Sequence, residues 1–477
     1  MKEWLLQLTP SIPEVFLLTM ACVILLARVF VKHQKNLSYI LALFSLVIAA
    51  WLTGATALEV PAFEFQSQYI VDNAAVLMKI AVYVLVFLTF IYSKRYVNER
   101  DIQTGEYYVL GLFATLGMQV LISAHHLLIL YLGLELLSLP LYAMVALERD
   151  NARAVEAAMK FFVMGAIASG LLLYGISLIF CATQALDIDK VALAITQNGV
   201  QHHLILVLGL VMVLAAIAFK LGAAPFHVWV PDVYDGAPSS VTLFISAAPK
   251  VAAFGLILRL LLVAMTDLQV EWQQILMVMG VLSIAIGNIV AISQTNIKRL
   301  LAYSSIAHMG YAILGLACAT PRGYGAALFY IITYSIMSLG AFGLLVMMSQ
   351  VNFEADNIDD LKGLNTRNPW LAFMMLLVMF SMAGVPPLVG FMAKVGILEA
   401  LIKAHFVGLA ILAIIFSIIG SYYYLRVVKV MYFEEPDTIA PVLCTMNEKM
   451  ALSLNGLAVL LLGILPGALF TVCHNLF

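Results

Sequence analysis

The sequence predicts an all-α integral membrane protein with about 14 transmembrane helices, and three observations lead to this prediction. Hydrophobic residues make up 63% of the 477 residues and charged residues only 11%, whereas soluble domains carry about 25% charged residues. The mean hydropathy of the chain is +1.01. Apolar runs long enough to cross about 30 Å of hydrocarbon recur from one end of the chain to the other.

Candidate spans follow one another with short connections, seven in each half of the chain. Each is close to the roughly 20 apolar residues that a transmembrane helix needs. In order along the chain, they cover residues 12–31, 38–56, 72–93, 107–124, 126–147, 156–182, 203–222, 239–264, 271–293, 299–318, 323–349, 369–402, 405–431 and 450–473.

Basic residues gather in alternate loops, as the positive-inside rule requires. One side carries Arg28, Lys32, Lys35, Lys94, Arg95, Arg100, Arg149, Arg153, Lys298, Arg299, Lys362, Arg367, Arg426, Lys429 and Lys449. The opposite side carries only Lys2, Lys190, Arg322 and Lys403. We therefore expect the basic loops to be cytoplasmic and both termini to be periplasmic.

Charge and motif content argue against several other classes of protein. The formal net charge is −2, so the overall balance gives no reason to expect a nucleic-acid partner. The five cysteines are scattered singly without a C-x-x-C pair, and neither a G-x-G-x-x-G fingerprint nor a P-loop occurs. We expect neither a cofactor nor a metal in this chain.

Six basic residues fall inside the candidate spans, where a lysine or arginine costs about 2.5 to 3.5 kcal/mol at the bilayer centre. They are Lys79, Lys160, Lys220, Lys250, Arg259 and Lys394. Lys160 and Arg259 lie near span ends, and we expect both to snorkel to the membrane surface. Lys79 lies about two turns inside its span, and the sequence leaves its role undecided.

Two lysines stand beside proline-containing breaks in otherwise apolar helices. Lys220 precedes Gly222 and Pro225, whereas Lys394 follows the pair Pro386-Pro387 within the span 369–402. Broken helices at membrane depth need protein or a wet cavity around them, and transporters build ion sites from them. A simple proline kink is the alternative reading of the first break. Two such breaks in corresponding halves indicate inverted repeats with an ion path between them.

Four further polar residues lie in apolar surroundings and are candidates for the same path. Glu135 has no charged neighbour for several residues on either side, so its carboxylate must be paired, hydrated or protonated. Lys250 lies mid-span, and His308 follows two serines. His227 lies in the first break. For Glu135, Lys250 and His308, a purely structural hydrogen bond is the competing explanation.

At these residues the chain resembles the antiporter-like membrane subunits of respiratory complex I, the proton-pumping NADH:quinone oxidoreductase, and their relatives in multisubunit cation/proton antiporters. The resemblance covers most of the chain. It rests on Gly-Leu-Glu135-Leu, Lys220 with Pro-Phe-His227-Val-Trp-Val-Pro-Asp, Ala-Pro-Lys250, Lys298-Arg-Leu-Leu-Ala-Tyr-Ser-Ser with His308, and Gly390-Phe-Met-Ala-Lys394. The lysine at 394 and the end at Phe477 without a long lateral helix resemble the subunit N type.

The resemblance implies one polytopic membrane domain over 1–477 with two inverted five-helix repeats, each containing a broken helix. Its parts would be N-terminal helices (1–106), a first repeat (107–264), a second repeat (271–431) and a C-terminal helix (432–477). It also implies a proton path through Glu135, Lys220, Lys250, His308 and Lys394, with Glu135 and Lys220 as a central pair and with His227 and Lys79 as possible accessory residues.

The same resemblance implies a translocase subunit of a bacterial cytoplasmic (inner) membrane that performs no redox chemistry itself. NADH, FMN, iron-sulfur clusters and quinone are then expected in partner subunits, some in the membrane and some peripheral. Two alternatives remain open at this point. One is a subunit of a multisubunit sodium/proton antiporter, and the other is a non-conducting membrane scaffold whose buried charges only hold helices together.

Overall fold

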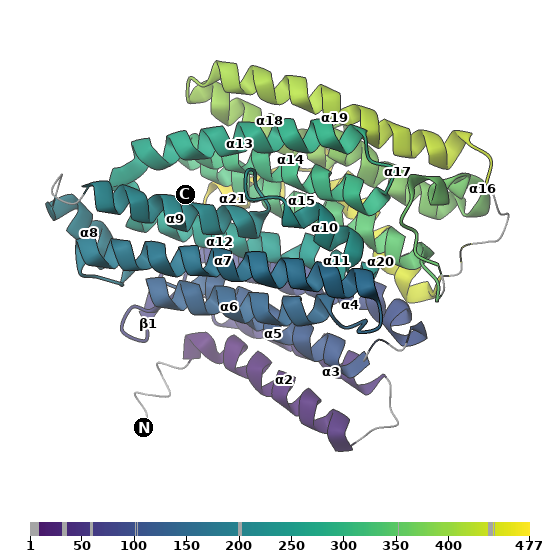
Figure 1. Cartoon of the computed structure of the whole chain (residues 1–477), viewed down its shortest axis with the longest axis horizontal. Helices are drawn as coiled ribbons and strands as arrows, with labels where there is room; N and C mark the ends of the chain where they lie inside the picture. Colours follow the sequence, from purple (N-terminus) through teal and green to yellow (C-terminus); the bar gives the residue numbers. More distant parts are fainter. Residues whose placement is uncertain are drawn as a thin grey trace. The chain divides into compact units, whose positions relative to one another are not determined.

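The computed structural model describes residues 9–30, 36–57, 61–100, 102, 104–198, 203–351, 353–436, 442 and 444–477. Lys2, Lys32 and Lys35, which contributed to the predicted orientation, lie outside the described residues. Twelve helices in the described part of the chain are long and apolar enough to cross a membrane, or thirteen if one pair bent by 75° forms a single span. The predicted class, an all-α membrane protein, is therefore confirmed (Figure 1).

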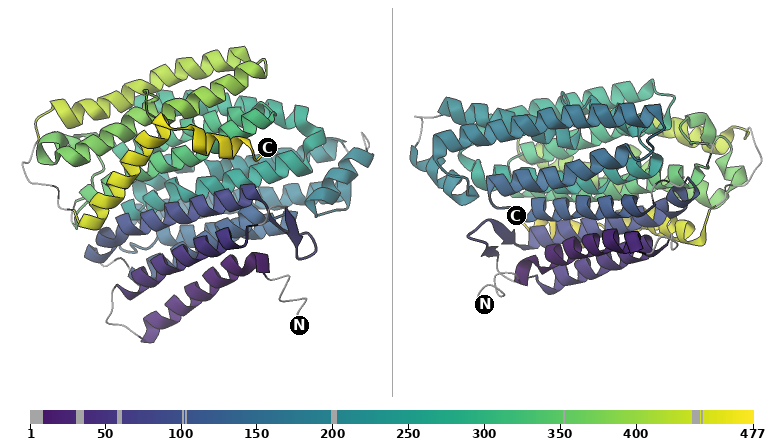
Figure 2. Two further views of the ribbon diagram at one scale, coloured as in Figure 1. Left: turned by 180° about the vertical axis from the view of Figure 1, so that it is seen from behind. Right: turned by 60° about the horizontal axis from the view of Figure 1, so that its bottom comes forward.

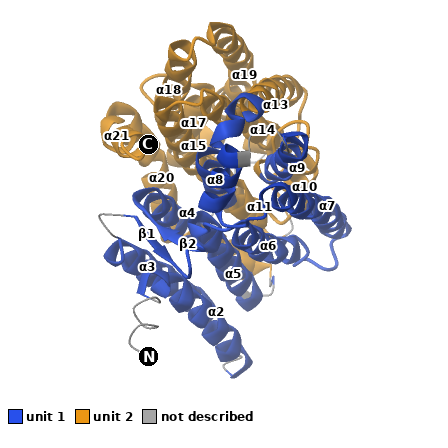
Figure 3. Cartoon of the chain, turned by 90° about the vertical axis from the view of Figure 1, so that its left-hand side faces the viewer, with its two compact units in different colours: residues 1–90, 101–220, 248–272 blue, residues 91–100, 221–247, 273–477 orange. Residues whose placement is uncertain are grey.

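The chain divides into two compact units, coloured in Figure 3. Unit 1 contains residues 1–90, 101–220 and 248–272. Its elements are η1 (Thr9–Ser11), α2 (Ile12–Phe30), α3 (Leu37–Ala55), β1 (Ala62–Glu64), β2 (Tyr69–Val71), most of α4 (Asn73–Glu99), α5 (Thr104–Ser123), α6 (Leu127–Val145), α7 (Ala152–Thr183), α8 (Ile188–Asn198), α9 (His203–Leu221), α12 (Ala248–Arg259), the π-helical turn η3 (Leu260–Ala264) and η4 (Thr266–Leu268).

Unit 2 contains residues 91–100, 221–247 and 273–477. Its elements are α10 (Trp229–Gly236), α11 (Ser239–Ser246), most of α13 (Gln269–Ile292), α14 (Ile297–Ala317), α15 (Pro321–Met348), η5 (Ile358–Leu361), α16 (Leu364–Arg367), α17 (Pro369–Ala383), α18 (Val389–Lys403), α19 (Val407–Phe433), α20 (Met446–Ile464) and α21 (Gly467–His474). Within this unit, α15 packs against α14, α17, α18 and α20, so it lies at the centre of the bundle.

The number of spans differs from the fourteen apolar runs for two reasons. The candidate span 369–402 consists of two shorter helices, α17 and α18, and the last candidate bends between α20 and α21. Neither short helix of the first pair would cross about 30 Å of hydrocarbon alone. The count of about fourteen, like the division into inverted repeats, stays a prediction.

A two-stranded antiparallel hairpin was not predicted. Strands β1 and β2 pair with Ala62 opposite Val71 and Glu64 opposite Tyr69. The strands are three residues each, and all three residues of β2 are buried. In the same unit, α2 packs against both α3 and α5, and Figure 2 shows α2 and α3 side by side.

Side chains and prolines define several helix ends as local sequence chemistry requires. Asn151 caps α7, since its Oδ1 accepts hydrogen bonds from the N–H groups of Arg153 and Ala154. Thr320 and Asn368 cap α15 and α17, and a proline follows each cap at the first helical position. Such caps satisfy N–H groups that have no partner within the helix, and proline costs nothing there.

Both predicted breaks are present. After α9, Gly222 adopts a positive φ of 74°, and the next helix of unit 2 begins only at Trp229. The N–H of Ala224 in this break donates to Ser283 Oγ at 2.8 Å. After α17, Gly384 adopts a φ of 91°, and Gly390 N–H donates to Ser381 Oγ at 2.9 Å. Buried hydroxyls therefore satisfy backbone groups that the breaks release, as membrane depth demands.

A third interruption divides the candidate span 239–264, which the sequence predicted as continuous. The helix α11 ends at Ser246, and Ala247 has a φ of −112° and a ψ of −83° before α12 begins. Within unit 2, the carbonyl groups of Ser246 and Ala247 accept hydrogen bonds from Ser338 and Ser335 of α15. Two serine hydroxyls thus stabilise the end of α11.

Candidate functional site

Glu135, Ser138 and Tyr142 lie on one face of α6. Their spacing of three and then four residues places side chains along one stripe of a helix with 3.6 residues per turn. Ser138 and Tyr142 are buried, with 3% and 7% of their surface exposed. Because α6 packs against α5 and α7, the stripe offers a carboxylate and two hydroxyls in the bundle of unit 1.

Lys220, at the end of α9, binds to this stripe. Its Nζ donates to Ser138 Oγ at 2.7 Å and to Tyr142 OH at 3.1 Å. The Tyr142 ring lies below it, with its centroid 5.6 Å from Nζ. Gly165 of α7 leaves room for the tyrosine, since a Cβ at Gly165 would overlap the Tyr142 hydroxyl. The sequence identified Lys220 but missed the two hydroxyls.

The structure does not bring Glu135 and Lys220 into direct contact. Among the described residues, Lys220 makes its hydrogen bonds to hydroxyl oxygens, and Glu135 Oε1 is buried without a hydrogen-bond partner. Glu135 nevertheless lies one turn before Ser138 on the same stripe, so its charge acts on Lys220 through space. A change in the separation of Glu135 and Lys220 would therefore alter the stability of the ammonium.

Lys250 is 1% exposed and is the third residue of α12. The interruption before α12 places this lysine in the first turn of the helix, four residues after Ser246, where α11 ends. Lys250 is therefore a buried amine beside an interrupted helix, as Lys220 and Lys394 are, which the sequence alone did not indicate.

Lys394 of α18 folds back onto the end of α17, across the second break. Its Nζ donates to the carbonyl oxygens of Met382 and Ala383 at 3.0 and 2.9 Å, and to Ser417 Oγ at 2.9 Å. The last carbonyl groups of a helix have no partner within it and carry its negative end. The break in the helix therefore creates the site that stabilises the Lys394 ammonium.

His308 of α14 lies within a chain of hydroxyl groups in unit 2. Its Nδ1 is 2.8 Å from Tyr330 OH, and its Nε2 is 3.0 Å from Tyr424 OH. Tyr424 OH also forms a short hydrogen bond with Ser304 Oγ. Both ring nitrogens therefore have hydroxyl partners that can donate or accept, so the imidazole can take a proton on one side and release one on the other.

Tyr311 lies between His308 and Lys394. Its ring centroid is 6.5 Å from that of His308 and 5.5 Å from Lys394 Nζ. Its hydroxyl donates to the carbonyl of Ala413 at 2.9 Å. Unit 2 thus brings two of the predicted path residues together around one tyrosine.

The two accessory candidates differ in their surroundings. His227 is half-buried in the first break, and its Nδ1 is buried without a partner among the described residues. Lys79 is paired, since its Nζ is 2.5 Å from Glu14 Oε1 and 2.7 Å from Tyr69 OH. Both charged side chains of that pair are more than nine-tenths buried. Lys79 therefore ties α4 to α2 and to strand β2.

Arg259 does not snorkel, so that prediction was wrong. Its guanidinium forms two hydrogen bonds of 2.6 Å with the two oxygens of Asp72, and the arginine is 9% exposed. Burial alone would raise the pKa of Asp72, but the hydrogen bonds and the charge of Arg259 lower that pKa below its ordinary value. Lys160 agrees with expectation because its side chain is 42% exposed and pairs with Glu156.

Lys298, read from the sequence as a loop residue, is 2% exposed. Its Nζ lies 2.8 Å from Asp356 and 3.5 Å from Glu354. Glu354 also contacts Arg100 at 2.7 Å. Burial opposes ionisation of Glu354, but the charges of Lys298 and Arg100 lower its pKa below the ordinary value. This network fixes the polar loop that follows α15.

One group of side chains in the described part of the chain has metal-ligand character. Atoms of His125, Asp187 and Asp189 lie within 4.8 Å of one another. His125 Nε2 is 3.0 Å from Asp189 Oδ2, and Asp187 Oδ1 accepts from the N–H groups of Asp189 and Lys190 at the start of α8. An ion pair and a helix cap therefore account for the group.

The fold and these sites define a class of protein, the multi-pass membrane proteins that translocate ions. Ionisable side chains are buried among the helices of each unit, and lysines lie beside interrupted helices. Both features mark ion paths in membrane proteins.

Comparisons with known proteins identify the family within that class. A family model described as NADH:quinone oxidoreductase/Mrp antiporter, TM, matches residues 124–420. The NADH-quinone oxidoreductase subunit N of Coxiella burnetii is 57% identical over 473 residues, 98% of each chain. That of Thioalkalivibrio sulfidiphilus is 52% identical over 464 residues, 97% of each chain. The chain belongs to the NADH:quinone oxidoreductase/Mrp antiporter membrane family, and the resemblance read from its residues is confirmed.

Solved structures agree with this assignment. A chain of respiratory complex I from Thermus thermophilus with bound aureothin is 31% identical, with a TM-score of 0.83, over 96% of this chain and 99% of that chain. A chain of the Mrp complex from a Dietzia species shares the fold with a TM-score of 0.86 at 19% identity, over 98% of this chain and 96% of that chain.

Proposed function

We propose that this chain is a proton-translocating membrane subunit of a bacterial NADH:quinone oxidoreductase. It moves protons through buried lysine, glutamate and histidine side chains and is driven by redox chemistry in partner subunits. The observation that carries the proposal is Lys220, an ammonium inside the apolar helices of unit 1 that binds two hydroxyls and contacts no carboxylate among the described residues. A lysine kept only for structure would be expected to have a close carboxylate partner, as Lys79 has.

In unit 1, proton transfer requires Lys220 to alternate between the ammonium and the neutral amine. Ser138 and Tyr142 stabilise the ammonium through their oxygen atoms, and the charge of Glu135 on the same stripe adds to that stabilisation. When Glu135 moves away or is protonated, the ammonium loses this support and releases a proton. Lys250, buried in the first turn of α12, is the next site on the proposed path.

In unit 2, the hydroxyl chain around His308 supplies a route for the proton. A proton donated to one ring nitrogen by a tyrosine hydroxyl allows the other nitrogen to donate to the opposite hydroxyl. Lys394 then holds a proton against the carbonyl end of α17. We place Glu135, Lys220, Lys250, His308 and Lys394 on the path and assign His227 an accessory role.

The energy of a hydrogen bond to Lys220 is comparable to the energy needed to move a proton against the membrane potential. Moving one charge against about 100 mV costs about 2.3 kcal/mol, and a tenfold change in proton affinity corresponds to about 1.4 kcal/mol. Gain or loss of a hydrogen bond to a charged group changes the free energy by about 1.5 to 3 kcal/mol. Rearranging one or two contacts of Lys220 therefore supplies energy of the required size.

The energy source and the topology are parts of the same proposal. NADH, FMN, iron-sulfur clusters and quinone belong to partner subunits, and this chain carries no cofactor. Both termini face the periplasm, and the basic loops face the cytoplasm. The repeats occupy 107–264 and 271–431, and support for them comes from the two breaks, since one falls in each range.

A sodium/proton antiporter subunit is the second candidate. It is favoured by the family description, which covers Mrp antiporters, and by the shared fold with the Mrp complex. The first test is purification of the full chain with its native partners. We expect flavin and iron-sulfur subunits to co-purify and NADH oxidation to acidify one side of reconstituted vesicles without sodium. Sodium-dependent transport in the absence of NADH-oxidising partners would favour the antiporter instead.

A scaffold role explains some of the buried charges but not all of them. Two buried ion pairs suit that role, because each lysine or arginine is already neutralised by a carboxylate. They are Lys79 with Glu14 and Arg259 with Asp72. If every substitution of Lys220 or Lys394 abolished assembly, and none gave an assembled complex that failed to pump, the scaffold reading would replace the proposal.

A further inference from the structure

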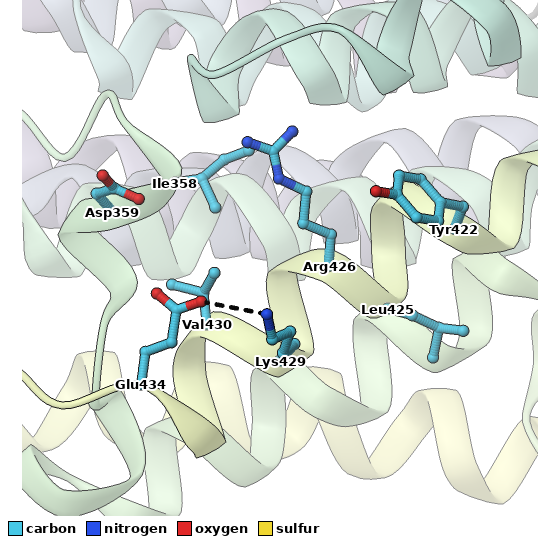
Figure 4. Close-up of a pocket in the computed structure, with 8 residues that line it drawn as sticks. All are labelled: Ile358, Asp359, Tyr422, Leu425, Arg426, Lys429, Val430 and Glu434. Carbon is cyan, nitrogen blue, oxygen red and sulfur yellow. Dashed lines mark ion pairs between the residues drawn. The ribbon is translucent and has the colours of Figure 1, made fainter.

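A pocket of about 530 Å³ lies at the C-terminal end of α19 in unit 2. Figure 4 shows its lining residues, among them Arg426, Lys429 and Tyr422 of α19, Asp359 of η5, and Glu434 just after α19. In the predicted topology this end of α19 reaches the cytoplasmic face of the membrane. The pocket therefore combines charged side chains with a position where lipid headgroups lie.

The charges in the pocket leave one cation without a carboxylate partner. Lys429 Nζ lies 3.8 Å from Glu434, and Asp359 is 3.3 Å from Lys362. Arg426 instead donates through Nη1 to the carbonyl oxygens of Ile292 and Gln294, at 3.4 and 3.2 Å. Among the described residues its guanidinium contacts no carboxylate, so its positive charge is available to an anion.

An apolar stripe leads along α19 to this pocket. Exposed side chains recur every three or four residues on one face of the helix, at Ile411, Ile415, Ile418, Tyr422 and Leu425, with exposed fractions of 46% to 66%. From Ile415 to Leu425 the helix rises about 15 Å, at about 1.5 Å per residue. That length is about half of the 30 Å hydrocarbon core, the depth of one lipid leaflet.

We infer that this pocket binds the phosphate group of an anionic phospholipid whose acyl chains lie along the α19 stripe. Arg426, oriented by two carbonyls, presents its remaining N–H groups to phosphate oxygens, and Lys429 adds a second positive charge. Tyr422 lies where apolar stripe and polar pocket meet, which suits an aromatic residue at the membrane surface. Basic pockets among transmembrane helices on the cytoplasmic side bind anionic headgroups in this way.

The inference is tested by native mass spectrometry of the full-length chain in detergent. Phosphatidylglycerol and phosphatidylcholine with identical acyl chains are added in parallel. We expect preferential retention of phosphatidylglycerol, and a loss of about fivefold in its affinity for each charge removed in Lys429→Gln and in Lys429→Gln/Arg426→Gln. The matched control is Lys160→Gln, which removes another exposed basic residue and should bind like the wild type.

Lys429→Gln is the decisive variant, because Lys429 is 70% exposed and its loss should leave the fold intact. Equal retention of the two lipids, or unchanged binding by this variant, would overturn the inference. Complete displacement of phosphatidylglycerol by inorganic phosphate would instead identify a free-phosphate site. In the assembled complex, a phosphatidylglycerol with a photoreactive acyl chain should label residues 411–425. Absence of that label would mean that a protein partner covers the stripe, and would also overturn the inference.

Discussion

Replacing Tyr142 with phenylalanine tests the hydroxyl site of Lys220 at the level of one atom. The substitution removes the oxygen that lies 3.1 Å from Lys220 Nζ and leaves the aromatic ring in place. Tyr142 OH also interacts with the Ser138 side chain, but Ser138 Oγ keeps its hydrogen bond to the carbonyl oxygen of Leu134 after the substitution. Ser138 Oγ then remains as the last hydroxyl partner of the ammonium.

The expected effect follows from the energy of that contact. A hydrogen bond to a charged group contributes about 1.5 to 3 kcal/mol, so the protonated form of Lys220 loses about 10- to 150-fold in relative population. This loss is comparable to the cost of about 2.3 kcal/mol for moving a charge against 100 mV. We therefore expect the variant to pump poorly against a membrane potential and better when that potential is collapsed.

The assay is proton uptake per NADH oxidised by the assembled complex in vesicles, with and without an ionophore that removes the potential. Tyr174→Phe is the matched control, because Tyr174 lies on α7 with 56% of its surface exposed. In a Lys220→Met background, Tyr142→Phe should have no further effect, since the contact is already lost. Normal pumping against the full potential by an assembled Tyr142→Phe complex would refute the reasoning.

Three further predictions concern stability. Asp72→Asn leaves the buried Arg259 without its carboxylate and should lower the free energy of unfolding of the full chain by about 3 to 5 kcal/mol. In the wild type the pKa of Asp72 is lowered in the folded state. The pair should therefore stabilise the fold fully above about pH 4, and this contribution should be lost as the pH falls through the lowered pKa of Asp72. Gly390→Ala would place a Cβ against the backbone of α17 and should destabilise by about 1 to 3 kcal/mol, whereas Gly408→Ala, with open space at its Cβ, should be neutral. Glu14→Gln removes the carboxylate that pairs with Lys79, so it should lower the melting temperature yet leave proton uptake per assembled complex unchanged. Impaired pumping by this variant would instead place Lys79 on the proton path.

Much of the fold could be predicted because membrane insertion leaves strong local signals. Apolar length identified the spans, and prolines after Lys220 and before Lys394 identified two breaks. A third signal was present and was missed. Pro249 lies in the first turn of α12, where proline is tolerated, and it marked the interruption before Lys250.

The partners of the buried charges could not be predicted, because they come from distant parts of the chain. Asp72 and Arg259 are 187 residues apart, and Tyr424 is 116 residues from His308. A single sequence does not indicate which distant residues come into contact in the folded chain. The position of Arg259 near a span end therefore suggested snorkelling, whereas its geometry is that of a buried bidentate pair.

Some local information about the Lys220 site was nevertheless available. Ser138 and Tyr142 follow Glu135 at helical spacing, so the hydroxyls could have been placed on the glutamate's face of α6. What the spacing could not reveal is that Lys220 would bind these hydroxyls and not the carboxylate. That choice depends on how α6 and α9 lie in the folded unit.

The central claim is that a proton resides on Lys220 during turnover, and the ratio of protons translocated to NADH oxidised tests it most directly. In reconstituted vesicles containing the assembled Lys220→Ala complex, we expect this ratio to fall well below that of the wild type, while Lys160→Ala keeps the wild-type ratio. A wild-type ratio in a fully assembled Lys220→Ala complex would contradict the account.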